Sequence, residues 1–239
     1  MFRELSKRMA MLGVTLTLGL LCIPWSSGAS LPGAYFERMA KSVKFAQEML
    51  DKNGPNLRAI EAGGGGTHFP YSILSPAVLY TRQHRDNPDY RNPKMLAQAI
   101  AIGDMLAAAS EERFFETRLD SDWDTYMWME AYRLLKGELG AEREARWRRE
   151  ILHNVDIVED WARPRRDFPW YATPYIGTSA NHYALYAMNL FLAGKVFEKP
   201  EMEALGEHIY RRFVTVEQAP DGYWGEHSRY VGDDKPYSL

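Results

Sequence analysis

The feature that most constrains the fold is a threefold repeat of paired helical segments. Apolar residues recur every three to four positions along most of the chain, which is the spacing of one helix face, and no run of alternating β-branched residues interrupts them. The first members of the pairs begin at intervals of roughly 50 to 55 residues, which is typical of helical-repeat architectures. A single helix over 32–51 precedes the pairs, which are 75–84 with 94–110, 124–137 with 142–162, and 179–197 with 201–218.

The two members of a pair differ in kind. Residues 184–193 are apolar on nearly every side and predict a buried helix, whereas the following segment carries Glu201, Glu207 and Arg211 on a polar face. Inner apolar helices and outer amphipathic ones predict an all-α fold, an α/α toroid of antiparallel helical hairpins. A closed ring of six hairpins needs more chain, so we expect an incomplete toroid over residues 30–239, either a fragment or a truncated reading frame.

Residues 1–29 have the pattern of a secretory signal peptide. Three of the first eight residues are basic, Arg3, Lys7 and Arg8, an apolar stretch follows, and small residues end at Ala29. We therefore expect an exported protein, periplasmic or extracellular, with no stable membrane association after cleavage. The single cysteine, Cys22, lies in this leader, so the mature chain has no disulfide and no thiolate chemistry.

Composition narrows the class of partner. A net charge of -3 and a pI near 6.1 provide no electrostatic footprint for nucleic acid. Aromatic residues make up 13% of the chain, with 7 Trp and 14 Tyr. This surplus fits a cleft that binds sugar rings and equally fits long helices packed through large side chains.

If the first members of the pairs are inner helices, the segments that enter them share one rim. Polar clusters fall there at 63–71, 120–130 and 177–183, and a fourth follows the last helix at 221–230. We expect these clusters to contact a substrate. The candidate binding residues are His68, Trp123, Tyr126, Trp128, Tyr183, Tyr223, Trp224, Glu226 and His227.

Several of these features also have a structural explanation. The glycine run 63–66 would cradle an anion, but it has no following Lys-Ser and no preceding strand, which favours a mobile loop. The alternating aspartates at 120, 122 and 124 lack the glycine and the later glutamate of a calcium loop, which favours a helix cap at Asp124 or Ser121. Glu130 is either a buried acid or the ion-pair partner of Arg133. We expect neither a metal nor a cofactor.

Two motifs carry a resemblance to a known family. Asn181-His182-Tyr183 opens a helix, and Asp221-Gly222, Glu226 and Arg229 follow the next helix. This arrangement resembles the α/α-toroid polysaccharide lyases, nearest the alginate lyase and chondroitin lyase superfamily. The resemblance covers roughly the last 60 residues, and the preceding hairpins match in architecture only.

The resemblance implies a site and a reaction. Asn181, His182 and Arg229 would surround the carboxylate of a uronate, in an acidic polysaccharide or oligosaccharide, and a tyrosine would exchange protons at the scissile bond. The family's His-Asn-Tyr context is absent here, which leaves Tyr230 or Tyr237 for that role. The reaction implied is β-elimination, in which hydrogen bonds to the carboxylate stabilise an enolate-like intermediate.

Two other functions remain open from the sequence. A toroidal glycoside hydrolase would pair Asp124 or Glu130 with Glu226 as its two carboxylates. A helical-repeat module would bind a glycan or a protein on its concave face without catalysis.

Overall fold

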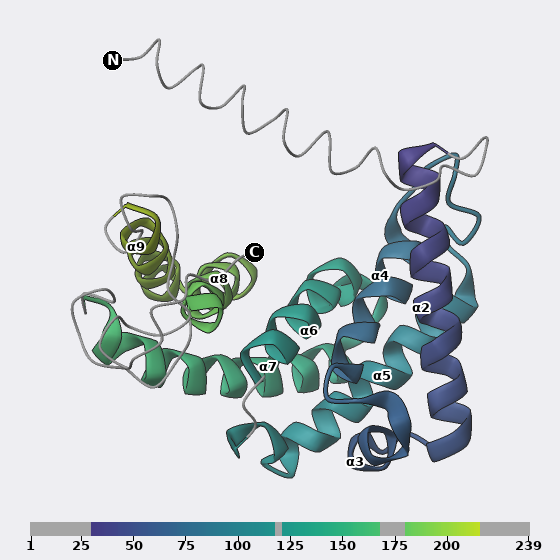
Figure 1. Ribbon diagram of the computed structural model, residues 1–239, viewed down its shortest axis with the longest axis horizontal. Helices are drawn as coiled ribbons and strands as arrows, with labels where there is room; N and C mark the ends of the chain where they lie inside the picture. The colour runs from purple at the N-terminus through teal and green to yellow at the C-terminus, as the bar shows by residue number, and fades with distance from the viewer. Residues whose placement is uncertain (1–29, 118–120, 168–179, 216–239) are drawn as a thin grey trace, which may run out of the picture.

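The computed structural model describes residues 30–117, 121–167 and 180–215, and every regular element within these ranges is helical (Figure 1). The all-α prediction is therefore confirmed for this part of the chain. The predicted segments agree with the observed helices to within a few residues, apart from positions 179 and 216–218, which lie outside the described residues. The helices are α2 (Leu31–Asn53), α3 (Leu57–Ile60), α4 (Leu74–Thr81), α5 (Pro93–Glu111), α6 (Ser121–Leu135), α7 (Ala141–Ala162), α8 (Ala180–Phe197) and α9 (Pro200–Thr215).

Local sequence signals explain where the helices begin and end. The Ser30 hydroxyl accepts a hydrogen bond from the Gly33 amide at 3.1 Å and caps the start of α2. Asn92 caps α5 in the same way, and Pro93 occupies its first turn, where no amide proton is needed. Gly54 ends α2 with a φ of 68°, a left-handed conformation that favours glycine.

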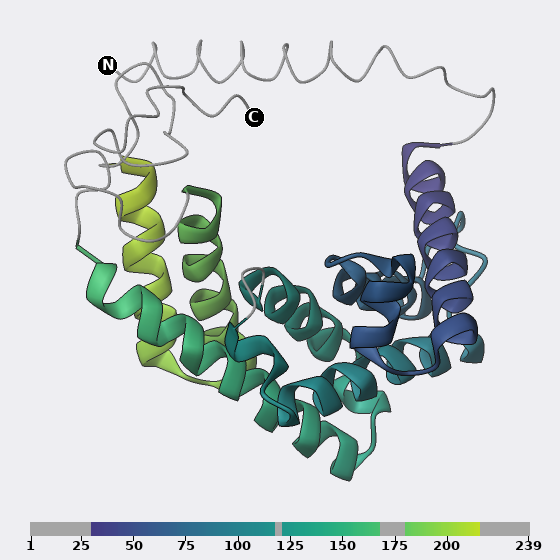
Figure 2. The same ribbon diagram turned by 60° about the horizontal axis from the view of Figure 1, so that its bottom comes forward.

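The helices form two layers that curve into an open arc (Figure 2). Helix α6 packs against α4 on one side and α8 on the other, while α5 and α7 pack against each other behind this row and α9 packs against α8. Within the described residues, α2 lies at one end of the arc and α9 at the other. The start of each inner helix therefore faces the same region of the molecule.

The outer layer is held by close packing of a tryptophan on a glycine. A Cβ atom at Gly103 of α5 would lie 2.0 Å from the Trp147 ring of α7, so only glycine admits this ring. The Trp147 indole N–H donates to Asp104 at 2.9 Å, which satisfies its one polar atom. Trp128 of α6 meets the same ring edge-on at 6.1 Å between centroids. Part of the aromatic surplus is thus core packing.

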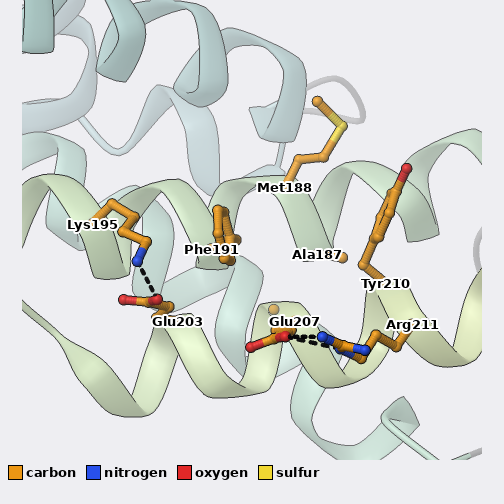
Figure 3. A pocket seen from close by; sticks show the side chains of 9 residues that line it. Ala187, Met188, Phe191, Lys195, Glu203, Glu207, Tyr210 and Arg211 are labelled. Atoms are coloured by element: carbon orange, nitrogen blue, oxygen red, sulfur yellow. Dashed lines mark hydrogen bonds and ion pairs between the residues drawn. The ribbon is translucent and has the colours of Figure 1, made fainter.

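Helices α8 and α9 approach each other even more closely. A Cβ atom at Gly194 would lie 2.5 Å from the Glu203 backbone nitrogen, and one at Gly206 would lie 2.5 Å from the Phe191 nitrogen. The two backbones therefore touch near the turn that joins the helices and again about midway along the pair. On one side they leave an open groove of about 670 Å³, with Phe191 and Tyr210 in its wall and a Glu207–Arg211 ion pair of 2.6 Å at its edge (Figure 3).

The glycine run is partly helical. Residues Glu61–Gly65 continue from α3 as a π-helical turn in which Gly64 adopts a φ of 107°. The Lys52 ammonium donates to the Gly63 carbonyl at 2.9 Å, and a Cβ atom at Gly65 would lie 2.9 Å from the Ile60 carbonyl oxygen. The glycines thus permit a tight, regular turn at the end of α3, at the position where the sequence favours a mobile loop.

None of the described helices combines the length and the apolar character needed to cross a membrane. The predicted leader, residues 1–29, lies outside the described residues.

Candidate functional site

The entrances of the three inner helices contact one another. His68 and Tyr71, in the segment that leads into α4, have ring centroids 5.0 Å apart, and Tyr71 stacks on Trp123 at 6.2 Å and 30°. Trp123 lies in the first turn of α6, next to Asp122, whose carboxylate meets the His182 ring in the first turn of α8. Three clusters that are far apart in the sequence therefore lie at one rim.

The contact between His182 and Asp122 is the most chemically distinctive feature of this rim. The His182 Nδ1 lies 2.8 Å from the Asp122 Oδ2, and the two side chains are 13% and 3% exposed. Burial raises the pKa of Asp122, and the hydrogen bonds from the His182 ring and from the backbone at Trp123 partly oppose this rise. The pair therefore places a titratable ring at the edge of the core.

Asn189 extends this contact into the interior. It is fully buried, and its side-chain amide donates to the Asp122 carbonyl at 2.8 Å and to the Leu185 carbonyl at 3.0 Å. Asn189 lies seven residues after His182, which places both side chains on the same face of α8. One face of α8 thus contacts the start of α6 at two points, through His182 and, two helical turns further on, through Asn189.

An aromatic row lies beside the pair. Trp123, Tyr126 and Tyr71 are half-buried, and His68 is exposed. Burial, together with the charge of Glu130, raises the pKa of Tyr126, so its hydroxyl stays protonated to higher pH. The sequence placed Tyr71 in the 63–71 cluster but not among the binding candidates. Its position three residues after His68 was the signal for the contact, because the two rings meet across the start of a 3-10 helix, Phe69–Ile73.

Two predicted binding residues lie in the core. Trp128 is 1% exposed and packs on Trp147, and Tyr183 is 1% exposed and packs against Phe213 at 5.8 Å between centroids. Helix geometry explains this result. Trp128 follows the rim residue Trp123 and Tyr183 follows His182 by only a few positions, so both point to another face of their helix.

Two of the three acids of the hydrolase hypothesis lie in the described residues, and one is paired and the other buried. Arg133 donates to the Glu130 carboxylate at 2.8 Å from its Nε, so the ion-pair explanation of Glu130 is the observed one. Asp124 is 2% exposed. Neither carboxylate lies open at the rim in the manner that a glycosidase acid requires.

The remaining predicted site residues lie outside the described residues: Tyr223, Trp224, Glu226, His227, Arg229, Tyr230 and Tyr237. Asn181 is described as part of α8, directly before His182. Within the described ranges, no group of three or more His, Cys, Asp or Glu side chains is arranged to hold a metal ion.

Comparison of the chain with protein-family models, with curated proteins and with solved structures finds no match. The geometry of the rim is therefore the basis for assigning a function.

Proposed function

We propose that this chain is an exported carbohydrate-active protein, a polysaccharide lyase that cleaves uronate-containing polymers by β-elimination, or a degenerate relative of one. The helix pairs would form part of an α/α toroid, and residues 1–29 would direct export. One observation carries the proposal: the entrances of α4, α6 and α8 meet, and they bring a carboxylate-bound histidine beside an aromatic row.

The aromatic row would bind the sugar. A pyranose ring presents apolar C–H faces, which pack well on aromatic rings. Trp123 and Tyr71 form a stacked pair of such rings, and His68 extends it toward solvent. A polymer lying along this row would pass the first turn of α8.

His182 would act as the general base. It would take the proton from the carbon next to the uronate carboxylate, and the electron pair left behind would form the carbon–carbon double bond as the glycosidic C–O bond breaks. The leaving oxygen would receive a proton from a tyrosine. The resemblance assigns that role to Tyr230 or Tyr237 and assigns neutralisation of the uronate carboxylate to Asn181 and Arg229.

The hydrolase alternative is weaker because Glu130 is paired with Arg133. That ion pair occupies the carboxylate that would have to act at the glycosidic bond. The binding-module alternative is compatible with the aromatic row and differs from the proposal only in catalysis.

The test is an absorbance assay for unsaturated uronate products with the mature chain and a panel of alginates and glycosaminoglycans. We expect turnover with at least one polymer and a loss of about 10²–10⁴-fold in His182→Ala, the range for a general base. His208→Ala is the matched control, because His208 is an exposed histidine of α9 that also pairs with an aspartate, Asp167. Binding of a polymer without any turnover would instead favour the binding module, and no response across the panel would exclude the lyase.

A further inference from the structure

We propose that Asp122 is a positioning residue for His182: its buried carboxylate holds the ring in the tautomer with the proton on Nδ1, which leaves Nε2 as the nitrogen that accepts a proton. This inference rests on the proposed function for its catalytic meaning, but its structural content stands independently of any substrate.

The geometry supports a charge-assisted hydrogen bond. The separation of 2.8 Å between Nδ1 and Oδ2 lies within the range for a ring N–H that donates to a carboxylate. An ionised carboxylate can only accept, so the shared proton belongs to the ring nitrogen. A neutral imidazole carries one ring proton, and placing it on Nδ1 makes Nε2 the basic nitrogen.

Several contacts of Asp122 oppose the effect of burial, which raises its pKa. Asp122 is the second residue of α6, where the free backbone amides and the helix dipole stabilise negative charge. Hydrogen bonds from the backbone of Asp122 and Trp123 act in the same direction. The start of α6 and the His182 ring therefore both stabilise negative charge on the Asp122 carboxylate.

The α8 side of the contact is also fixed. Asn189 donates to the backbone carbonyl of Asp122, two helical turns away from His182 on the same face of α8. A rotation or slide of α8 that moved His182 from the carboxylate would also break this second hydrogen bond. The two contacts together define the position of the ring relative to α6, which is what a proton-transfer group requires.

The experiment measures the tautomer directly. In the ¹⁵N-labelled full chain, long-range ¹H–¹⁵N spectra distinguish protonated from unprotonated ring nitrogens, and His182→Gln assigns the signals. We expect Nδ1 to carry the proton in the unmodified protein, and Asp122→Asn to shift the population toward the Nε2–H tautomer. Asp104→Asn is the control: Asp104 also links two helices, through Arg143 and Trp147, but is not the partner of His182.

The outcomes separate this inference from the proposed function. A ring protonated on Nε2 in the unmodified protein, or a tautomer unchanged by Asp122→Asn, would overturn the positioning role, and the first result needs no variant that must fold. If a substrate polymer is found, Asp122→Asn should lower kcat at least about 10-fold with little change in KM, because the aspartate acts through the ring. If the tautomer is as expected and no polymer is cleaved, the lyase proposal fails and the positioning of His182 stands.

Discussion

The two sides of α8 are built on opposite principles. Toward α6, the helix presents His182 and Asn189, and both make directional hydrogen bonds with Asp122 in a largely buried interface. Toward the groove that it shares with α9, it presents Met188 and Phe191, which are 38% and 40% exposed. The polar residues are thus buried and the apolar ones are open, the reverse of the usual arrangement.

This inversion shows that the burial of a side chain on α8 depends on which neighbouring helix it faces. An inner helix with neighbours on both flanks buries both, as α6 does between α4 and α8. Among the described residues, α8 has such a neighbour only on the α6 side. The polar side chains that this flank buries therefore need hydrogen-bond partners within the interface. Variants on the two sides should therefore behave differently.

The largest effect should come from the contact between α8 and α9. In Gly206→Ala the new methyl group would lie 2.5 Å from the Phe191 nitrogen and 2.6 Å from the Ala187 carbonyl oxygen, so the helices must separate. We expect destabilisation toward the upper end of the roughly 1–3 kcal/mol typical of overpacking, measured by urea unfolding. Gly137→Ala is the control, because nothing lies within 4 Å of its added methyl group. Equal stability of the two variants would show that the helix pair is not packed as closely as described.

A smaller loss is expected from the buried polar side of α8. Asn189→Ala removes the donor to the Asp122 and Leu185 carbonyls and should cost about 1–2 kcal/mol, since buried acceptors lose their partner. Asn53→Ala is a matched control, because the half-buried Asn53 donates only within its own helix, to the Met49 carbonyl at 3.0 Å. Unfolding free energies of the two variants test the comparison, and a larger loss in the control would contradict it.

The pH dependence of stability should differ between the native protein and Asp122→Asn. Because the pKa of Asp122 is raised by burial, the folded protein binds this proton more tightly than the unfolded chain. Its contribution is fully present below the ordinary value of 3.8 and is lost as pH rises through the folded value. The asparagine variant lacks this decline, so its stability relative to the native protein should rise from acidic to neutral pH, as measured by chemical unfolding at several pH values. A relative fall would mean that the carboxylate is stabilised by folding.

The smallest effect should come from the open groove. Met188→Gln and Phe191→Gln replace exposed apolar groups, and each should change the free energy of unfolding by no more than about 0.5 kcal/mol. Leu190→Gln, at a fully buried position between them, is the control and should be clearly more destabilising than either groove variant. Thermal unfolding of the three variants gives the ranking, and a strong loss at the groove positions would reveal that this face is covered in solution.

Helical periodicity predicted the helices well because each one depends on local spacing and on caps such as Asn92. The short α3 and its glycine turn were missed, since four residues carry too little periodicity to detect. The rim was predicted as a location, from where the inner helices begin. The sequence did not predict which members of a cluster line the rim, because neighbouring residues on a helix point to different faces. Trp123 therefore lies at the rim and Trp128 in the core.

The sequence alone determined the all-helical class, the pairing of helices and the sites where they start, because these follow from local chemistry. Only the tertiary structure decided that Asp122 meets His182 from another hairpin 60 residues away, and that Glu130 is held by Arg133. Such pairings depend on the rotation of one helix against another, which is set by packing over the whole interface and by close contacts such as Gly206 on Phe191. No local pattern in the sequence encodes that rotation.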